Sequence, residues 1–435
     1  MHVAMIGAGY VGLVSGACFA EFGIDVTVVD KDPARIEALK LGRIPIFEPG
    51  LEELVTSNVA DKRLHFTTDT AEAVNGADAV FIAVGTPSRR GDGHADLSYV
   101  FAAVREVCAA LTGPTVLVTK STVPVGTGRK VAALAQEVRP ELDIAVASNP
   151  EFLREGSAIG DFMRPDRVVI GTDSERARMV LRRLYRPLYL IETPIVFTGL
   201  ETAELIKYAA NAFLATKITF INEIADLCEK VGADVHDVAK GIGLDGRIGR
   251  KFLHAGPGFG GSCFPKDTLA LVRTAQDVRS PVRIVETVVE VNDRRKAAMA
   301  ERVIAACGGS VEGKTIAVLG LTFKPETDDM RDAPSLAIVP RLVDAGAVVR
   351  AFDPEGMDQA RPLLPPAVVY CRDAYDAAQG ADALVVITEW NEFRAIPPDR
   401  LAAVMKGRVV VDLRNIFDPA AMREAGFAYS SIGRS

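Results

Sequence analysis

The stretch Gly7-Ala8-Gly9-Tyr10-Val11-Gly12 decides the fold of the N-terminal part of this chain. A short apolar segment, residues 2–6, precedes it and predicts a β-strand, and residues 11–22 predict a helix that follows. A second, β-branched segment over 25–30 ends on Asp30. A strand, a glycine loop, a helix and a second strand that ends on an acid are together typical of a dinucleotide-binding unit.

Each glycine of the loop has its own physical reason. Gly7 allows the tight turn, Gly9 lets the backbone approach a pyrophosphate, and Gly12 lets the helix pack closely on the strand. The pyrophosphate is expected at the helix N-terminus, where free N–H groups carry partial positive charge. We therefore expect the loop to bind a dinucleotide through Gly7, Gly9, Tyr10, Val11 and Gly12.

Asp30 predicts which dinucleotide is bound. At the end of the second strand, a carboxylate accepts hydrogen bonds from a ribose 2′-hydroxyl and repels a 2′-phosphate. The expected cofactor is therefore NAD rather than NADP. Lys31 and Arg35 follow closely in the sequence and weaken this preference, because positive charge nearby tolerates a phosphate.

Strands and helices continue to alternate beyond this unit. Short apolar segments bounded by Gly, Pro or polar residues predict buried strands over 79–84, 115–120, 144–148 and 168–171. Such alternation predicts a parallel sheet with helices on both faces.

The pattern changes after residue 200. Between 201 and 230 apolar residues recur every three or four positions without a Gly or Pro, which predicts one long helix. Further helical patterns occupy 268–274 and 284–307. A helix of this length at the centre of a two-lobed protein is often a dimer interface, so we expect a homodimer or a larger homo-oligomer.

The strand–helix alternation returns at residue 313. Strands are expected over 315–319, 348–352, 383–388 and 409–412, and a helix over 335–345. Only one glycine of the fingerprint follows the first of these strands, so a second dinucleotide site is not expected. The predicted fold is α/β, with two Rossmann-like domains joined by a helical domain with a long central helix. The expected boundaries are 1–199, 200–305 and 306–435.

Composition excludes several classes of protein. The chain has 435 residues, a net charge of −7, 6% aromatic residues and one tryptophan. An acidic chain with few aromatic residues is a poor nucleic-acid binder, and we expect no such partner. No apolar run reaches the ~18 residues of a membrane span, and the apolar N-terminus lacks the basic start of a signal peptide. We expect a cytoplasmic protein that does not enter the membrane.

The six cysteines form no Cys-x-x-Cys pair, which argues against a zinc site and a disulfide framework. We expect no metal. Five of them lie in helical or apolar patterns and are expected to be inert core residues: Cys18, Cys108, Cys228, Cys307 and Cys371.

The sixth cysteine lies in the stretch Gly258-Phe259-Gly260-Gly261-Ser262-Cys263-Phe264-Pro265-Lys266-Asp267. The glycines let a substrate come close to Cys263, and the charge of Lys266 lowers the pKa of a nearby thiol. Asp267 follows at the start of a predicted helix and can act on a water or a proton. A structural turn with an unreactive thiol fits the same residues.

Further candidates come from the long helix and from the ends of the N-terminal strands. Lys207 and Asn211 are four residues apart and therefore share one helix face, which could also be an ordinary helix surface. Glu151, Thr86 and Thr122 follow predicted strands, where ligands bind in such sheets. An acid at such a place can be a base, a substrate ligand or simply a loop residue.

An NAD site and a nucleophilic cysteine have a joint chemical logic. Removal of a hydride from an alcohol gives an aldehyde, which a thiolate can trap as a thiohemiacetal. A second hydride transfer gives a thioester, and water releases an acid. Lys207 and Asn211 could hold the oxyanions of these intermediates. The residues thus favour a four-electron oxidation at one site.

These motifs resemble the UDP-glucose/GDP-mannose dehydrogenase family over nearly the whole chain. The shared segments are the glycine fingerprint, 47–51, 84–87, 121–124, 149–153, Lys207 with Asn211, the cysteine loop and 320–324. The cysteine loop and its spacing from Lys207 are highly specific. The resemblance implies two successive NAD-dependent oxidations at carbon 6 of a nucleotide sugar, here UDP-glucose to UDP-glucuronate, a precursor for polysaccharide synthesis. It also implies that the C-terminal domain binds the UDP-sugar.

The resemblance implies roles residue by residue. It makes Cys263 the nucleophile, with the catalytic neighbours Lys207, Asn211, Asp267, Glu151 and Thr122. Beyond the glycine loop and Asp30, it implies NAD contacts from Arg35, Thr86, Thr122, Glu155, Lys266 and Arg331. It implies substrate contacts from Glu151, Phe152, Leu153, Arg154, Glu155, Lys207, Asn211, Phe252, Leu253, His254, Ala255, Gly256, Gly260, Lys324 and Arg414, and from Arg247 of a second subunit.

Three alternatives stay open. A GDP-mannose or N-acetylated UDP-sugar dehydrogenase shares the chemistry, although Ser262 stands where the N-acetyl-sugar branch usually has His. A two-electron hydroxyacid dehydrogenase would need no cysteine. A catalytically dead nucleotide sensor would not need the set formed by Cys263, Lys207, Asn211 and Asp267.

Overall fold

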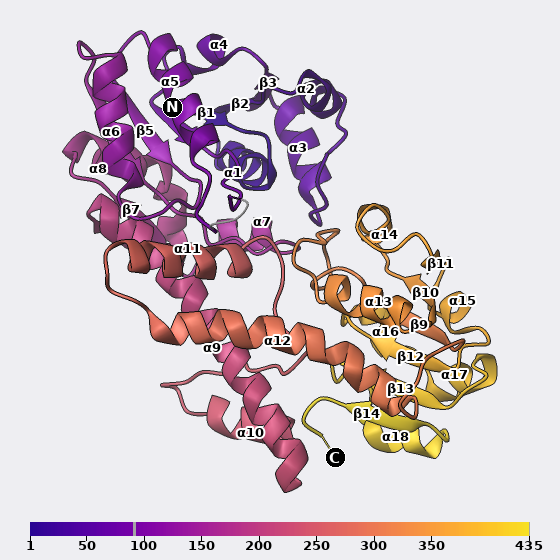
Figure 1. The fold of residues 1–435 in the computed structure, drawn as a ribbon. Coiled ribbons are helices and arrows are strands. Elements are labelled where there is room, and N and C mark those ends of the chain that lie inside the picture. The colour runs from indigo at the N-terminus through magenta and orange to yellow at the C-terminus, as the bar shows by residue number, and fades with distance from the viewer. Residues whose placement is uncertain (90–92, 435) are drawn as a thin grey trace. The chain divides into compact units, whose positions relative to one another are not determined.

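The structure is a computed structural model that describes residues 1–89 and 93–434. The chain divides into two compact units, each with its own sheet (Figure 1). Unit 1 comprises Met1–Ala210 with Arg273–Arg279, and unit 2 comprises Asn211–Val272 with Ser280–Ser435.

Unit 1 is built on an eight-stranded sheet with the order β3-β2-β1-β4-β5-β6-β7-β8. Its strands are β1 (His2–Ile6), β2 (Asp25–Val29), β3 (Leu64–Thr67), β4 (Ala79–Ile82), β5 (Thr115–Thr119), β6 (Ile144–Ser148), β7 (Val168–Gly171) and β8 (Ile195–Thr198). Its helices are α1 (Tyr10–Glu21), α2 (Pro33–Lys40), α3 (Leu51–Ala60), α4 (Thr70–Val74), α5 (Ser98–Ala110), α6 (Thr127–Val138), α7 (Ala158–Met163), α8 (Glu175–Leu184) and the 3₁₀ helix η1 (Arg186–Ile191). All six strands predicted here are confirmed, whereas β3 and β8 were not predicted.

The sheet departs from the predicted parallel arrangement at β7. Strands β1 to β6 pair in parallel, but β7 runs antiparallel to β6, through Ser148 and Gly171. A parallel pair needs a long crossover that returns the chain to the starting end of the sheet. The link between β6 and β7 holds the six-residue α7 and does not make that return. Strand β8 then follows β7 in parallel.

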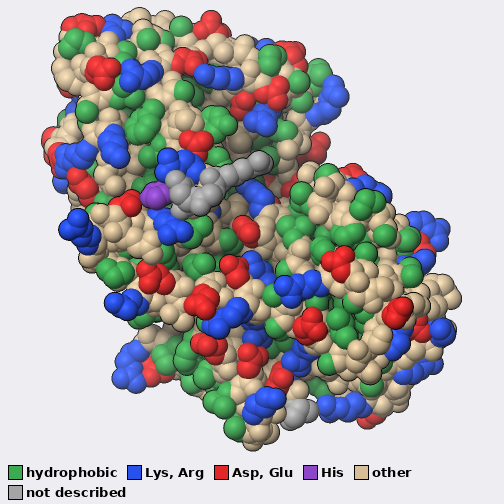
Figure 2. Space-filling model, in the orientation of Figure 1, with side chains coloured by type: hydrophobic (Ala, Val, Ile, Leu, Met, Phe, Trp, Pro, Cys, Tyr) green, Lys and Arg blue, Asp and Glu red, His purple; other side chains and the backbone are tan. Residues whose placement is uncertain are grey.

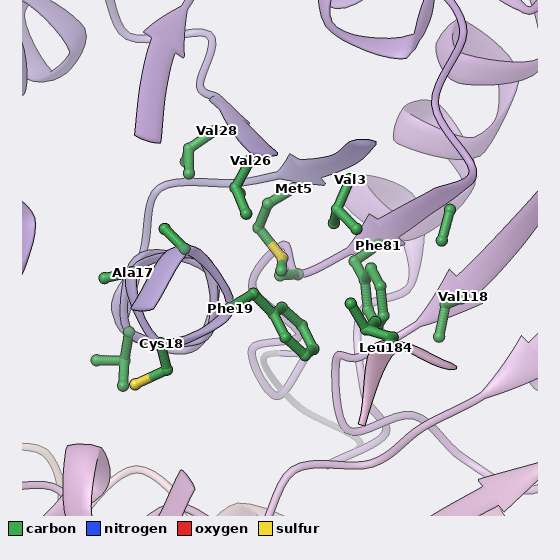
Figure 3. Close-up of a cluster of buried hydrophobic side chains, with 14 of the residues drawn as sticks. Val3, Met5, Ala17, Cys18, Phe19, Val26, Val28, Phe81, Val118 and Leu184 are labelled. Atoms are coloured by element: carbon green, nitrogen blue, oxygen red, sulfur yellow. The ribbon is translucent and has the colours of Figure 1, made fainter. Parts of the chain in front are cut away.

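The sheet face beneath α1 carries an apolar core, which Figure 3 shows. The ring of Phe19 on α1 lies 5.4 Å from that of Phe81 on β4, centroid to centroid. A Cβ at Gly16 would stand 2.9 Å from a methyl carbon of Val28, so a glycine lets α1 approach β2. This packing holds the N-terminus of α1 at the end of β1. Cys18 belongs to the same core, and burial raises the pKa of its thiol to about 12.

Unit 2 contains most of the long helix α9 (Leu200–Val231), which begins in unit 1. It adds α10 (Val235–Gly243), most of α11 (Phe264–Asp277) and α12 (Arg283–Ala306). The predicted long helix over 201–230 is confirmed. The helices expected over 268–274 and 284–307 are also confirmed. The first lies within α11, and the second matches α12 to within one residue at either end.

A six-stranded sheet of order β11-β10-β9-β12-β13-β14 forms the rest of unit 2, and all its pairs are parallel. The strands are β9 (Thr315–Leu319), β10 (Val348–Phe352), β11 (Val369–Tyr370), β12 (Ala383–Val386), β13 (Val409–Asp412) and β14 (Ala428–Ser431). The helices are α13 (Ser335–Asp344), α14 (Met357–Ala360), α15 (Ala374–Ala378), α16 (Asn391–Arg394), α17 (Pro398–Val404) and α18 (Pro419–Glu424). The predicted second Rossmann-like domain is confirmed.

Asp353 follows β10 as Asp30 follows β2, but hydrogen bonds within unit 2 occupy the Asp353 carboxylate. The side chain is fully buried and accepts hydrogen bonds from the N–H groups of Leu321 (2.6 Å) and Gly356 (2.7 Å) and from Nε1 of Trp390 (3.2 Å). This acid is therefore fully engaged by the fold, whereas the Asp30 side chain is 14% exposed.

The surface mixes charges of both signs over the face seen in Figure 2, in keeping with the small net charge. Across residues 1–89 and 93–434, no helix is long and apolar enough to cross a membrane. The same residues contain no group of three or more His, Cys, Asp or Glu side chains placed to hold a metal ion.

Candidate active site

The glycine loop has the geometry that its sequence predicts. Gly7 has φ +107°, and a Cβ there would meet the carbonyl oxygen of Ala83 at 2.7 Å. A Cβ at Gly12 would lie 1.9 Å from the carbonyl oxygen of Gly7, so α1 can pack here only with a glycine. Among residues 1–89 and 93–434, no heavy atom apart from those of its chain neighbours lies within 4 Å of a Cβ built at Gly9. The N-terminus of α1 is thus open to a phosphate group.

Asp30 is held as an ionised acceptor beside this loop. Its Oδ2 accepts hydrogen bonds from the Ala8 N–H (2.9 Å) and from Arg35 Nη1 (3.1 Å). Burial acts to raise the pKa of Asp30. The hydrogen bonds from the Asp32 and Ala8 N–H groups and the charge and hydrogen bond of Arg35 outweigh burial, so the pKa is lowered. Lys31 pairs instead with Glu106 at 2.7 Å. Both neighbouring cations are therefore neutralised by carboxylates.

The candidates at the strand ends of unit 1 come together. Thr86 Oγ1 donates to the Thr122 carbonyl at 2.9 Å. Lys207 on α9 contacts Glu151, with Nζ 3.2 Å from Oε1, and both side chains are buried. A small pocket is lined by Thr119, Ser121, Thr122, Val123, Ser148, Pro150, Glu204 and Lys207. The structure thus joins Thr122 and Lys207, which the sequence named separately, in one pocket.

The loop after Glu151 is fixed by contacts that the sequence did not reveal. The ring of Phe152 carries the Arg167 guanidinium at 3.5 Å and the Lys207 ammonium at 5.2 Å from its centroid. Arg154 pairs with Asp161. Glu48 accepts hydrogen bonds from the Gly156 and Ala158 N–H groups, both at 2.7 Å.

Glu48 also links that loop to the fingerprint. The hydroxyl of Tyr10, the first residue of α1, donates to Glu48 Oε2. Burial and the Glu48 carboxylate raise the pKa of Tyr10, so its hydroxyl stays protonated. Tyr10 therefore connects the dinucleotide loop with the segment that carries Glu151 and Glu155.

Within unit 2, Cys263 immediately precedes α11. Its Sγ lies 3.5 Å from the Ser262 hydroxyl, and its carbonyl accepts the Asp267 N–H at 2.8 Å. Asp267 is fully buried and accepts from Asn211 Nδ2 (2.6 Å) and Lys266 Nζ (2.5 Å). A thiolate at this helix end is favoured by the helix N–H groups.

The glycine-rich segment before Cys263 is clasped by side chains of α9 and α12, which sequence reasoning missed. The Asn292 amide accepts from the Phe259 N–H (2.8 Å) and donates to its carbonyl (3.0 Å). Asn222 Oδ1 accepts the Gly256 N–H at 2.8 Å, and Arg295 Nε donates to the Gly256 carbonyl at 2.6 Å. Helical residues of this kind carry no local sequence signal, because they meet the loop only in the fold.

The segment of unit 2 that is expected to bind substrate, residues 252–256, ends at Gly256, which Asn222 and Arg295 bind. Leu253 and Ala255 are buried, His254 is exposed, and Phe252 has φ +65°. A Cβ at Gly260 would lie 2.3 Å from the Asp332 carbonyl oxygen.

The candidate cations of unit 2 have different surroundings. Arg414 donates to the Ile387 and Phe323 carbonyls and pairs with Glu389 at 3.0 Å. Lys324 Nζ lies 5.5 Å from the centre of the Phe323 ring. Arg331 pairs with Asp329 at 2.8 Å. Arg247, which contacts Asp245, has a side chain 90% exposed.

Three family models match this chain in order. The models of the UDP-glucose/GDP-mannose dehydrogenase family match residues 1–189 (NAD binding domain), 201–294 (central domain) and 317–419 (UDP binding domain).

Relatives match over the full length. A UDP-glucose 6-dehydrogenase of Rhizobium meliloti is 66% identical, covering 100% of both chains. The solved structure of a UDP-glucose dehydrogenase from Pyrobaculum islandicum is 39% identical, with a TM-score of 0.92, over 100% of this chain and 98% of that one. A UDP-D-ManNAc dehydrogenase structure from Pyrococcus horikoshii is 28% identical, with a TM-score of 0.87, over 100% and 99%.

Proposed function

This chain belongs to the UDP-glucose/GDP-mannose dehydrogenase family, and from that premise we propose that it oxidises carbon 6 of UDP-glucose twice, giving UDP-glucuronate. It is an NAD-dependent enzyme. The observation that carries the choice of sugar is the 66% identity over the full length with a UDP-glucose 6-dehydrogenase. The lower identity to the N-acetyl-sugar enzyme and Ser262 before the cysteine support the same choice.

NAD bound at the glycine loop would supply the hydride acceptor, twice for each sugar. The loop residues Gly7, Gly9, Tyr10, Val11 and Gly12 and the ionised Asp30 fit that cofactor, because they offer an open helix N-terminus and a hydroxyl acceptor. We assign Arg35, Thr86, Thr122, Glu155, Lys266 and Arg331 as further cofactor residues on family resemblance.

Cys263 is the proposed nucleophile. The first oxidation turns the alcohol into an aldehyde, and the thiolate adds to its carbon to give a thiohemiacetal. The second oxidation gives a thioester, and water then releases the carboxylate and the thiol. Per sugar, two NAD and one water yield two NADH and three protons. The place of Cys263 at the start of α11 supports the thiolate form.

The neighbouring side chains have complementary roles. Lys207 and Asn211 stabilise the oxyanions of the intermediates, and Asp267 orients Asn211 through the 2.6 Å hydrogen bond. Glu151, paired with Lys207, assists thioester hydrolysis. Thr122 is assigned to the nicotinamide end of the NAD site on family resemblance. The UDP-sugar contacts are assigned to residues 151–155, 252–256, Gly260, Lys324, Arg414 and Arg247 of a second subunit.

A substrate panel tests the reaction. UDP-glucose, UDP-galactose, UDP-N-acetyl sugars and GDP-mannose are each incubated with NAD, and NADH is counted per sugar consumed. Two NADH from UDP-glucose, at the highest kcat/KM of the panel, is the expected result. One NADH per sugar indicates a hydroxy-group dehydrogenase, and faster turnover of GDP-mannose indicates the other branch.

The covalent step has a separate test. Cys263→Ser is expected to lose turnover by orders of magnitude while it still binds UDP-glucose, because serine forms far less alkoxide than cysteine forms thiolate. Cys371→Ser, at a buried thiol of unit 2, serves as the control. Two NADH per sugar at a near wild-type rate from Cys263→Ser would exclude covalent catalysis by this residue.

The proposed homodimer forms along α9. Phe213, Phe220 and Leu227 recur every seven residues on this helix, and their side chains are 66%, 50% and 55% exposed. An apolar row at this spacing on an exposed helix face fits a second copy of the same helix. Phe220→Glu is expected to yield a monomer in sedimentation velocity, and an unchanged dimer would exclude this interface.

The proposal also covers the cell compartment and the domain limits. The six cysteines are free, as in proteins of the reducing cytoplasm, where we place the enzyme. The proposed division into NAD-binding (1–199), helical (200–305) and UDP-sugar-binding (306–435) parts is supported by the order of the three family models.

A further inference from the structure

The start of α6 is capped by a side chain from another helix. Gly126 is the residue before α6 and has φ +89°, and no side chain of its own segment caps the helix. Glu204 of α9 takes this place: its Oε2 accepts the Gly126 N–H and its Oε1 accepts the Gly128 N–H, both at 2.6 Å. One carboxylate thus satisfies two N–H groups that a helix N-terminus leaves free.

Glu204 is almost wholly buried, with 3% of its surface exposed. A buried carboxylate is costly unless it is hydrogen-bonded. Burial raises the pKa of Glu204, and the hydrogen bonds from Gly128, Gly126 and Ser148 oppose this rise. The helix N-terminus also favours a negative charge at this point. This side chain is therefore bound in a defined geometry rather than solvated.

The segment that Glu204 caps is the loop that carries Thr122. The other end of this loop is held by Ser121 Oγ, which donates to the Val84 carbonyl at 2.6 Å, and by the hydrogen bond from Thr86 to the Thr122 carbonyl. Glu204 lies three residues before Lys207 on α9, and both line the small pocket beside Thr122.

We propose that Glu204 is a positioning residue, which fixes the loop from Ser121 to Gly128 and so holds Thr122 at the nicotinamide end of the NAD site. The inference rests on the proposed function, which places Thr122 there. Glu204 does not touch the reacting atoms; it acts through the backbone of the loop.

A substitution at Gly128 allows a second test of the contact between Glu204 and the loop backbone. A Cβ at this position would lie 3.1 Å from Glu204 Oε1 and 3.2 Å from Ser148 Oγ. Gly128→Ala therefore keeps the carboxylate group, but its neighbours, Leu200 Cδ2 at 3.1 Å among them, have to shift away from the loop by a few tenths of an ångström.

The experiment compares Glu204→Gln and Gly128→Ala with Glu201→Gln. Glu201 is one turn earlier on α9 and also contacts α6, through Arg129 at 2.7 Å, but its side chain is 44% exposed. It loses the same charge without touching the loop backbone, and an exposed pair of this kind contributes little, so kcat should stay within about twofold.

Glutamine offers one acceptor where the carboxylate offers two, and its NH₂ group meets a backbone N–H. We expect kcat of Glu204→Gln to fall about 10- to 100-fold, as for a misplaced catalytic group. The KM for UDP-glucose should stay near the wild-type value. Hydrogen exchange of peptide 121–130 should become faster in Glu204→Gln and not in Glu201→Gln. Gly128→Ala should change the same quantities in the same direction, but less.

Normal kcat per folded enzyme in Glu204→Gln overturns the inference, and so does an equal rise of KM for NAD and for UDP-glucose. If Glu204→Gln does not fold, Gly128→Ala decides: unchanged kcat and exchange overturn the proposal. Wild-type enzyme in the same assay tests the proposed function separately. If it makes no NADH from UDP-glucose, that function fails, while the exchange data still test the loop contact.

Discussion

Asp30 is the single residue from which we expect the choice between NAD and NADP. The sequence placed this acid correctly, because strand, glycine loop, helix and acid follow one another within 30 residues. It could not show that Arg35 and Lys31 are engaged by Asp30 and Glu106, since those partners are fixed by the fold. The structure therefore shows that Lys31 is engaged by Glu106, whereas Arg35 stays beside Asp30 as its ion-pair partner.

A preference for NAD of at least tens-fold in kcat/KM over NADP is expected. The 2′-phosphate would lose the hydrogen bonds of the 2′-hydroxyl and meet a carboxylate, a difference of about 2–3 kcal/mol. Asp30→Ala should reduce this preference, because it removes the repulsion and frees Arg35. Steady-state kinetics with both cofactors check the values, and Asp25→Ala, at an exposed acid at the start of β2, is the control. Equal kcat/KM in the wild type would contradict this role of Asp30.

Lys120 is a second residue whose state depends on its surroundings. It is buried, and its Nζ donates to Asn149 Oδ1 (3.1 Å) and Tyr185 Oη (3.2 Å). Burial lowers its pKa to about 8, while the Glu151 charge acts to raise it and the Lys207 charge to lower it further. No local sequence pattern marks this lysine, which lies at the end of β5 beneath the loop of Glu151.

The lowered pKa of Lys120 predicts a pH-dependent stability. Below pH 10 the unfolded chain binds a proton that the folded chain releases near pH 8, so stability rises with pH between about 8 and 10.4. Over that range the free energy of unfolding of the wild type should gain up to about 3 kcal/mol relative to Lys120→Met. Denaturant unfolding at several pH values measures it. Lys130→Met, at an exposed lysine of α6, should run parallel to the wild type at all pH values. A constant difference between wild type and Lys120→Met would show that Lys120 does not titrate in this window.

At the scale of elements, long and periodic segments were predictable and their mutual contacts were not. The period of apolar residues gave α9 to within one residue at either end, and the short apolar runs gave the strands around the site. The reversal at β7 was missed, because strand direction depends on the length of the link and leaves no mark in the strand itself. The clasp of the glycine segment by α12 was missed because its residues meet that segment only in the fold.

Asn292 of α12 is expected to control sugar binding through this clasp. Its replacement by leucine leaves the Phe259 N–H and carbonyl unpaired in a buried place, which costs about 1–3 kcal/mol for each group. The KM for UDP-glucose should rise at least about tenfold, while the dissociation constant for NAD, measured by calorimetry, stays the same. Arg294→Ala on the same helix removes only an exposed pair with Glu290 and is the control. A raised dissociation constant for NAD with unchanged sugar KM would place the effect elsewhere.

At the scale of the whole molecule, the residues assigned to the proposed reaction come from both units, and one of them is assigned to a second subunit. The glycine loop, Thr122, Glu151 and Lys207 belong to unit 1, and Cys263 and Asp267 belong to unit 2. The motifs of both were recognisable in the sequence, because each is local. The proposed contribution of a second chain is not local, and it is assigned to Arg247, whose side chain is 90% exposed.

Mixing two inactive variants tests this contribution of Arg247. Arg247→Ala and Cys263→Ala should each have very low activity, the first because a substrate phosphate loses its cation and the second because it lacks the nucleophile. In a hybrid dimer, one site receives Arg247 from the Cys263→Ala chain and keeps Cys263 from the other, so it is intact. After random exchange half of the dimers are hybrids, and about a quarter of wild-type activity should return. Mixed dimers are confirmed by native mass spectrometry, and each variant alone, at the same total concentration, provides the background. If confirmed hybrids stay inactive, Arg247 serves its own subunit or no site at all.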